Sequence, residues 1–181
     1  MTMRLLVLAL VWVSPLSVSA QDSLLITGKS ITIQGQTSLG KFACTYSEIH
    51  QPKAAFIRNG ANPIPVLFLE LPIEDFDCGN KILNKDFRET LRAAEHPSIG
   101  ISVDNFRKIE NYYLSTVSLT LGGKVSELLE LRFIKIDKHG NTYLKSEFKL
   151  STSSFELSPP KKLFGLIKLR ETLEVSICLY Y

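Results

Sequence analysis

The side chains best able to do chemistry are few and scattered along the chain. The three histidines, His50, His96 and His139, have no partner at the interval of three or four residues that a metal site on a helix uses. Asp75 and Asp77 could be taken for a carboxylate pair, but their alternate positions indicate a solvated loop. No nucleophile elbow or phosphate-binding loop is present. The sequence therefore predicts no enzyme, no metal site and no catalytic cofactor.

Three cysteines leave one thiol over after any pairing, so the cysteines allow at most one disulfide. Cys44 lies in an early predicted strand, and Cys78 lies just before a predicted helix. We expect these two to pair, which would tether the approach to the helix and contribute about 3 to 4 kcal/mol. Cys178 lies in the last predicted strand and is interpreted as a small packed side chain, not a nucleophile.

The second candidate site is a set of large apolar side chains at alternating positions. Two interpretations stay open: they fill a solid core, or they line a tunnel that holds an apolar chain. In the second case the ligand-binding residues are Ile31, Ile33, Phe42, Phe68, Ile101, Val117, Leu119 and Phe148.

Most of the chain alternates apolar and polar residues, which is the pattern of strands with one buried face. Short turns separate the strands, including Gly122-Gly123 and 137–141. About eight strands linked in this way predict an all-β fold, an antiparallel barrel that closes on itself and so leaves no exposed edge. The predicted strands cover 24–26, 30–35, 42–46, 66–73, 99–103, 113–121, 128–136, 143–150 and 173–179, some of them short.

One segment has the periodicity of a helix, predicted at about residues 84–95. Asn84 can cap it, and Phe87, Leu91 and Ala94 share its apolar face. The helix must end before Pro97. We expect it to cover the strand at 66–73, which would then be buried on both sides.

The first twenty residues resemble a secretory signal. Arg4 precedes an apolar run from Leu5 to Val13, and small residues at 18–20 allow cleavage near Ala20. The remainder, 21–181, is predicted as one domain of an exported protein, periplasmic or secreted, with no stable membrane insertion. The net charge of +3 comes with mixed signs throughout, which predicts no nucleic-acid partner. Whether the chain forms a homodimer is left open.

Several short motifs resemble those of the YceI-like family, in the same order and spacing. They are Leu91 with 96–99, the run 119–123, 148–150 with 155–160, 165–169, and the alternation of Leu173, Val175, Ile177 and Leu179. The resemblance implies an eight-stranded, lipocalin-like antiparallel barrel with one packed helix, outside the bacterial cytoplasm. It also implies a long isoprenoid or other amphiphilic lipid in the barrel. A disulfide between Cys44 and Cys78 is similar to that of one branch of the family.

The sequence differs from the family pattern at three places, one of which is the region near Ser30, where the family's early histidine-containing strand is not evident. Glu156 stands where a glycine is usual, and Gly100 stands where an aromatic residue is common. The functional hypothesis is an exported protein that holds an apolar, polyisoprenoid-type chain for storage or transport. The alternative is a structural or partner-binding barrel with a filled core, whose interaction surface lies near Pro159-Pro160.

Overall fold

The computed structural model describes residues 23–38, 40–49, 55–58, 67–138, 140–157 and 170–181. The predicted ligand-binding residues and the three cysteines all lie inside these ranges. The predicted signal segment, His50, His139 and the Pro159-Pro160 loop lie outside them.

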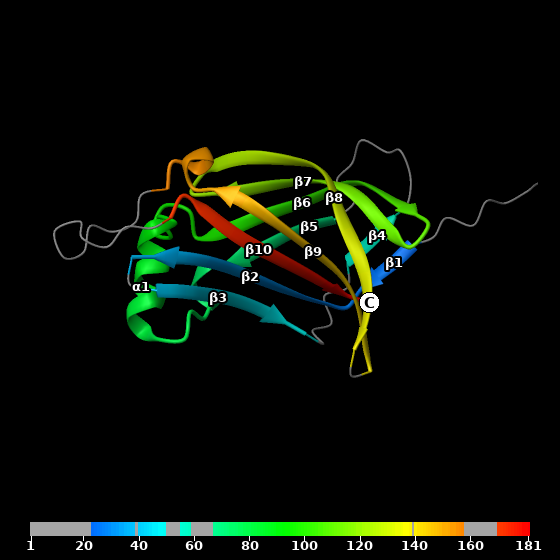
Figure 1. Cartoon of the computed structure of the whole chain (residues 1–181), viewed down its shortest axis with the longest axis horizontal. Coiled ribbons are helices and arrows are strands. Elements are labelled where there is room, and N and C mark those ends of the chain that lie inside the picture. Colours follow the sequence, from blue (N-terminus) through cyan, green and yellow to red (C-terminus); the bar gives the residue numbers. More distant parts are fainter. Residues whose placement is uncertain (1–22, 39, 50–54, 59–66, 139, 158–169) are drawn as a thin grey trace, which may run out of the picture.

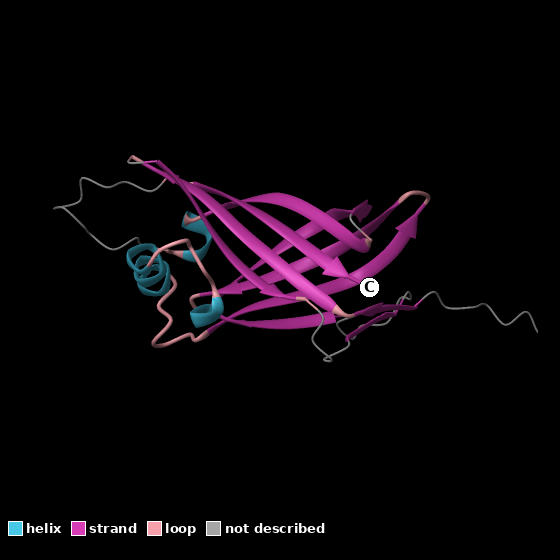
Figure 2. Ribbon diagram, turned by 90° about the horizontal axis from the view of Figure 1, so that it is seen from below, coloured by secondary structure: helices cyan, strands magenta, loops and turns pink. Residues whose placement is uncertain are grey.

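The chain forms an eight-stranded antiparallel sheet that curls into a barrel-like shape (Figures 1 and 2). Its strand order is β3-β2-β10-β9-β8-β7-β6-β5. The strands are β2 (Gly28–Thr37), β3 (Gly40–Glu48), β5 (Leu67–Pro72), β6 (Ser98–Ile109), β7 (Tyr112–Leu121), β8 (Lys124–Lys138), β9 (Asn141–Ser151) and β10 (Thr172–Tyr180). A separate two-stranded sheet pairs β1 (Ser23–Ile26) with β4 (Ala55–Arg58). The predicted all-β, lipocalin-like eight-stranded fold is confirmed.

Two irregularities in the strands bend the sheet. The register between β6 and β7 shifts after Asp104, where Asn105 has a φ of 51°. The register between β7 and β8 shifts after Ser115, and Glu130 on β8 has a φ of 55°. Bulges of this kind increase local twist, so they favour a curled sheet over a flat one. The β7–β8 hairpin turns at Gly122 and Gly123, both with positive φ, as the sequence predicted.

The two edge strands of the sheet, β3 and β5, meet through the segment that follows β5. The backbone N–H groups of Thr45 and Asp77 each donate to the other residue's carbonyl oxygen, at 2.8 and 3.0 Å. Beside this bridge lies the disulfide between Cys44 and Cys78, which confirms the predicted pairing. Within the described residues, β3 and β5 are not joined by a ladder of several residue pairs. One bridge and one disulfide therefore fasten the edges of the sheet near α1.

The only α-helix in the described residues, α1 (Lys81–Thr90), begins earlier than predicted. Asn80 is its N-cap, and the Asn80 side chain accepts a hydrogen bond from the N–H of Leu83 at 2.9 Å. The predicted cap, Asn84, lies inside the helix. Its side-chain oxygen accepts from the backbone N–H of Cys78 at 2.6 Å, so Asn84 fixes the approach to the helix instead.

The helix also ends earlier than predicted, because Arg92 adopts a left-handed conformation with a φ of 53°. The N–H of Ala93 donates to Arg88 O and the N–H of Arg92 donates to Glu89 O, the pair of bonds that closes a Schellman motif. Arg92 then donates a side-chain hydrogen bond to Gly122 O at 2.6 Å, which ties the helix end to the β7–β8 turn. Pro97 is therefore not what stops this helix.

The helix lies at one end of the curled sheet (Figures 1 and 2). Leu91 is buried and Phe87 is partly buried against the core, as predicted, but Ala94 is exposed and Ala93 packs in its place. Phe87 contacts Phe76, with ring centroids 5.2 Å apart. The two 3-10 turns, η1 (Ile73–Asp75) and η2 (Ser153–Phe155), place Ile73 and Phe155 in the same core.

The expectation that the helix buries the outer face of 66–73 is wrong. The outward residues of β5, Phe68 and Glu70, are exposed, and only its alternate residues Leu67, Leu69 and Leu71 are buried. A strand with one exposed face needs no helix over it.

Candidate ligand-binding site

The inner face of the sheet is mostly apolar, and this surface is built by the period-two alternation of its strands. Five of the predicted interior residues lie on it and are at most 6% exposed: Ile31, Ile33, Ile101, Val117 and Leu119. These side chains pack closely against one another in a single cluster. Their role as ligand contacts stays a prediction.

Phe42 and Phe148 are partly buried and pack against the same cluster. Phe42 lies opposite Gly35, in the β2–β3 pairing. A Cβ atom built on Gly35 would lie 2.4 Å from the Phe42 ring, so the ring occupies the space that a side chain at position 35 would need. The absence of a side chain at Gly35 therefore makes room for the Phe42 ring beside the β2 backbone.

The placement of Phe68 in the interior is wrong. Its side chain is 62% exposed on the outer face of β5. Its ring passes beside Gly100, where a Cβ atom would lie 3.8 Å away, so it covers a bare stretch of β6 backbone from outside. A long apolar run does not show which of its two alternating sets of residues faces inward. The prediction for Phe68, which lies in the run at 66–73, was wrong for this reason.

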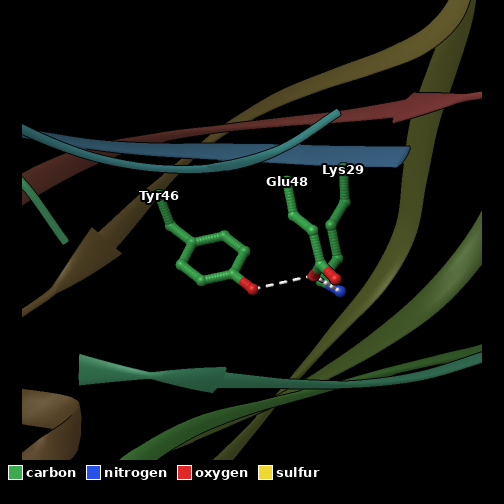
Figure 3. A network of polar contacts seen from close by, with 3 residues as sticks. All are labelled: Lys29, Tyr46 and Glu48. Carbon is green, nitrogen blue, oxygen red and sulfur yellow. Dashed lines mark hydrogen bonds and ion pairs between the residues drawn. The ribbon is translucent and has the colours of Figure 1, made fainter. Parts of the chain in front are cut away.

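A polar cluster interrupts the apolar inner face at the end of the sheet away from α1, where β2 begins and β3 ends (Figure 1). Lys29 and Glu48 form an ion pair across the β2–β3 ladder, and the hydroxyl of Tyr46 donates to the Glu48 carboxylate at 2.8 Å. All three side chains extend to the side of the sheet that faces β5 (Figure 3). The Lys29 and Glu48 side chains are only 17% and 18% exposed. We refer to Lys29, Tyr46 and Glu48 as the polar cluster.

The environment of this cluster holds the Tyr46 hydroxyl in its neutral form. Burial, the hydrogen bond to Glu48 and the negative charges of Glu48 and Asp75 raise the pKa of Tyr46 to about 12. The Lys29 ammonium also lies 5.7 Å from the centre of the Tyr46 ring. Tyr46 connects the cluster to the helix through Phe76, whose ring centroid is 5.5 Å away.

Two buried serines on the inner face differ in their hydrogen bonding. Ser115 and Ser146 are each 2% exposed. The hydroxyl of Ser115 donates to the carbonyl of Asp104 at 2.6 Å, at the β6 bulge. The hydroxyl of Ser146 has no hydrogen-bond partner among the described residues. A buried hydroxyl without a partner is costly, so Ser146 requires an explanation.

Sequence reasoning missed the polar cluster and Ser146, although the signal for the cluster was present. Lys29 continues the alternation of Ile31 and Ile33 toward the strand start, and Glu48 continues that of Cys44 and Tyr46 toward the strand end. Extending each pattern by one step would have placed both charges inside the sheet.

The outer face carries two other features. A surface pocket of about 290 Å³ lies across β2, β10 and β9, lined mainly by outward polar side chains: Thr32, Gln34, Glu147, Lys149, Glu174 and Ser176, with Phe148 and Val175. Cys178 is a free thiol, partly exposed on β10. Burial raises the pKa of the Cys178 thiol, so the protonated form is favoured, in agreement with a packed side chain.

Among the residues that the structure describes, no three or more His, Cys, Asp or Glu side chains gather as metal ligands would. In the same part of the chain, no helix has the length and apolar character needed to cross a bilayer.

No protein-family model matches the chain, and no curated protein matches it. Solved structures do. A polyisoprenoid-binding domain from Saccharophagus degradans, described as implicated in plant cell wall breakdown, is similar with a TM-score of 0.60 and 11% identity, over 88% of this chain and 97% of the other. Burkholderia cenocepacia BcnA is similar with a TM-score of 0.57 and 14% identity, over 84% of this chain and 96% of the other.

A Campylobacter jejuni YCEI protein also matches over 97% of both chains at 13% identity, but a TM-score of 0.43 is too low to support an argument. The first two likenesses cover nearly the whole described architecture and concern the fold alone. The chain therefore has the same barrel-like fold as these two proteins, which is the fold that its sequence motifs indicated.

Proposed function

We propose that this protein binds an apolar lipid chain, of polyisoprenoid type, against the inner face of its curled sheet, for storage or transport. The observation that carries the proposal is the largely apolar inner face, in a fold shared with a polyisoprenoid-binding domain. Burial of the ligand's methylenes supplies the driving force, at about 0.8 kcal/mol for each CH₂. The protein acts as a binding protein and not as an enzyme.

The close packing of the inner side chains sets a condition on this function. Val117, Ile177 and Leu179 are each 0% exposed, so a ligand chain must separate side chains that now touch. The sheet has a place where this can happen, because in the described residues no ladder joins β3 to β5, and β3 meets the segment after β5 only through one bridge and the disulfide. Movement of the two edges apart, away from the disulfide, would open the inner face without breaking a ladder.

The close packing also supports a second candidate, a barrel with a filled core that binds a partner through its surface. In that case the inner residues contribute stability only, as in any close-packed interior. The two candidates make opposite predictions about bound lipid.

Export to an oxidising compartment, periplasmic or extracellular, is part of the proposal. The Cys44–Cys78 disulfide supports it, because such bridges persist mainly outside the reducing cytoplasm. N-terminal sequencing of protein from the periplasm or the medium should find a start near Gln21.

The experiment is native mass spectrometry of the purified mature chain, followed by solvent extraction and lipid analysis. The expected result is an added mass that matches an extracted apolar lipid. Ile101→Ala, on the inner face, should change the amount bound, and Phe68→Ala, on the outer face of the adjacent strand, should not. An unliganded mass together with an empty extract contradicts lipid binding and favours the filled core.

A further inference from the structure

Apolar and aromatic side chains gather on the outer face of the sheet, at the end away from α1 (Figure 1). They are Tyr112, Ile134, Ile136, Tyr143 and Tyr180, and we refer to them as the outer patch. We propose that the outer patch docks this protein onto the surface of an anionic lipid bilayer. This docking goes beyond lipid binding on the inner face, because it concerns a different surface and a different partner, and its test needs no bound cargo.

The strand register places the five side chains of the outer patch side by side on four neighbouring strands. Tyr112 on β7 lies opposite Ile134 on β8, and Ile136 on β8 lies opposite Tyr143 on β9. Tyr143 in turn lies opposite Tyr180 on β10, with ring centroids 5.1 Å apart. The adjacent residues of β8, β9 and β10 that face the core are fully buried: Phe133, Leu144 and Leu179. Since side chains alternate along a strand, the outer patch faces away from the core.

The outer patch differs in composition from the rest of the outer face. Nearer α1, the outward positions of β9 and β10 carry polar side chains: Glu147, Lys149, Glu174 and Ser176. At the other end of the same two strands, Tyr143 and Tyr180 occupy the outward positions. Beside them on β8, Ile134 is 45% exposed. This change from polar to aromatic and aliphatic residues along one face indicates a surface that contacts something less polar than water.

The charges around the outer patch favour an anionic partner. Three carboxylates on the adjoining parts of β8 and β9 each form an ion pair with a lysine or arginine: Glu130 with Arg107, Asp137 with Lys135, and Glu147 with Lys145. Arg132 and Lys138 are exposed, and neither forms an ion pair with another described residue. Lys108 and Glu110, near the β6–β7 turn, are both exposed and offset each other. The charge left for a partner is positive, which complements anionic lipid head groups.

The side chains of the outer patch are of the kind that lies at the boundary between head groups and acyl chains. A tyrosine can bury its ring below the head groups while its hydroxyl stays hydrated. The guanidinium of Arg132 lies 4.1 Å from the centre of the Tyr112 ring, so a cation accompanies this ring to the level of the phosphates. The outer face of the curled sheet is convex (Figure 2), and a convex face touches a flat bilayer over a limited area. We therefore expect a reversible contact at the surface, without insertion of a strand or helix.

Vesicle sedimentation with the mature, disulfide-bonded protein tests this docking. The probes are vesicles of phosphatidylcholine alone and vesicles of phosphatidylcholine mixed with phosphatidylglycerol, each at low and at high salt. The protein should bind the mixed vesicles more tightly, and salt should weaken that binding. Arg132→Gln should lower the affinity for the mixed vesicles about 5-fold, the value expected for one cation near an anionic surface, and should leave the affinity for neutral vesicles unchanged.

Two exposed β-branched residues of β8 provide a matched pair of variants. Ile134→Thr, inside the outer patch, should lower the affinity for vesicles about 5-fold, because less apolar surface enters the bilayer. Val125→Thr is the control. Val125 is 68% exposed but lies beside the β7–β8 turn, which the Arg92 side chain ties to the end of α1. Its substitution should leave the affinity unchanged. Both substitutions keep a β-branched side chain, and circular dichroism checks that both variants are folded.

A tryptophan probe shows which part of the protein touches the lipid. The one tryptophan of the sequence, Trp12, lies in the predicted signal segment, so the mature chain of 21–181 has none. In Ile134→Trp the new indole is therefore the sole tryptophan, and lipids brominated on their acyl chains should quench its fluorescence. In Val125→Trp the fluorescence should not be quenched.

The outcomes decide between the bilayer and other partners. If the wild type binds neither kind of vesicle, or if Ile134→Thr and Val125→Thr weaken binding equally, docking through the outer patch is wrong. If vesicle binding is absent and ultracentrifugation finds a dimer that Ile134→Thr dissociates, the outer patch is a contact between two copies of the chain, and the bilayer contact is refuted. Native mass spectrometry of the same protein decides separately whether lipid is bound inside, so either proposal can fail while the other stands.

Discussion

Replacing Cys44 and Cys78 together with alanine should lower the free energy of unfolding by about 4 kcal/mol. The disulfide joins residues 34 apart in the sequence. On the chain-entropy model, closing a loop of that length in the unfolded chain is worth about 4 kcal/mol at 25 °C. A domain of this size has a total stability of about 5 to 15 kcal/mol, so the loss is a large fraction of it.

Urea unfolding of the oxidised wild type and of the double variant measures this difference. Cys178→Ser is the control: the Cys178 thiol is free and partly exposed, so the change should stay within about 0.5 kcal/mol. A thiol titration of the unfolded wild type should find one free thiol for each mature chain. A difference below about 1 kcal/mol between wild type and double variant would refute the reasoning, because the bridge would then not constrain the unfolded chain.

Hydrogen exchange can show where the native state loosens. In the part of the chain that the structure describes, Thr45 and Asp77 form the one backbone bridge between β3 and the segment after β5, directly beside the disulfide. In the double variant their exchange should accelerate through local opening of the edges, beyond the change due to global stability. Amides in the middle of the β9–β10 ladder, such as that of Val175, should change by the global amount only. Equal acceleration at both places would contradict a local role for the bridge.

Four further predictions concern the free energy of unfolding. The pKa of Tyr46 is about 12 in the folded state and about 10 in the unfolded chain, so folding favours the neutral hydroxyl. The stabilisation that Tyr46 contributes is therefore fully present below pH 10 and is lost as the pH rises toward 12. In urea unfolding curves measured over this pH range, Tyr46→Phe should reduce the fall in the free energy of unfolding. Asn80→Ala should cost about 1 kcal/mol through loss of the helix cap, measured by chemical unfolding. Ser115→Ala should cost about 1 kcal/mol, whereas Ser146→Ala should leave the free energy of unfolding unchanged or raise it, and the same unfolding curves compare the two. Phe68→Ser should stay within about 0.5 kcal/mol, because that ring is mostly in solvent; a cost of several kcal/mol would mean that it packs inward after all.

The fold could be predicted from the sequence because it depends on a local and repeated pattern. Alternation along Tyr112–Leu121 and Thr172–Tyr180 identified both the strands and their buried faces. Gly122-Gly123 located a hairpin, and both residues have the positive φ that the turn requires. The disulfide pairing followed because Cys44 and Cys78 lie beside elements that a closing sheet brings together.

The errors occurred where local sequence allows two answers. Asn80 and Asn84 are both good caps, and the structure uses one for the helix and the other for the chain before it. Arg92 has a left-handed conformation, which is usually adopted by glycine, and its side chain donates a hydrogen bond to Gly122. An arginine at this position does not predict the end of a helix. Phe68 lies in an apolar run, and only the pairing of β5 with β6 decides which of its alternate residues face inward.

The candidate site was predicted in part for a related reason. Apolar residues on the inner face are found by periodicity, and five of the proposed contacts are buried there. The polar residues of the site were not predicted, because a lysine or glutamate at a strand end is normally solvated. Only the curl of the sheet turns Lys29 and Glu48 inward. Ser146 has no signal in sequence at all, since its lack of a partner is a property of the packed structure.

The polar groups inside the sheet distinguish a filled core from a ligand-binding interior. An inner ion pair and an unpartnered hydroxyl are both unfavourable compared with well-packed apolar residues of the same size. If the core is only structural, Ser146→Ala and the double change of Lys29→Met with Glu48→Gln should leave stability equal or higher, with no loss of any binding. If the interior binds an amphiphilic lipid, the same variants should again be no less stable, yet they should bind that lipid less tightly. Stability alone does not separate the two, so the decisive measurement is affinity and stability on the same variant.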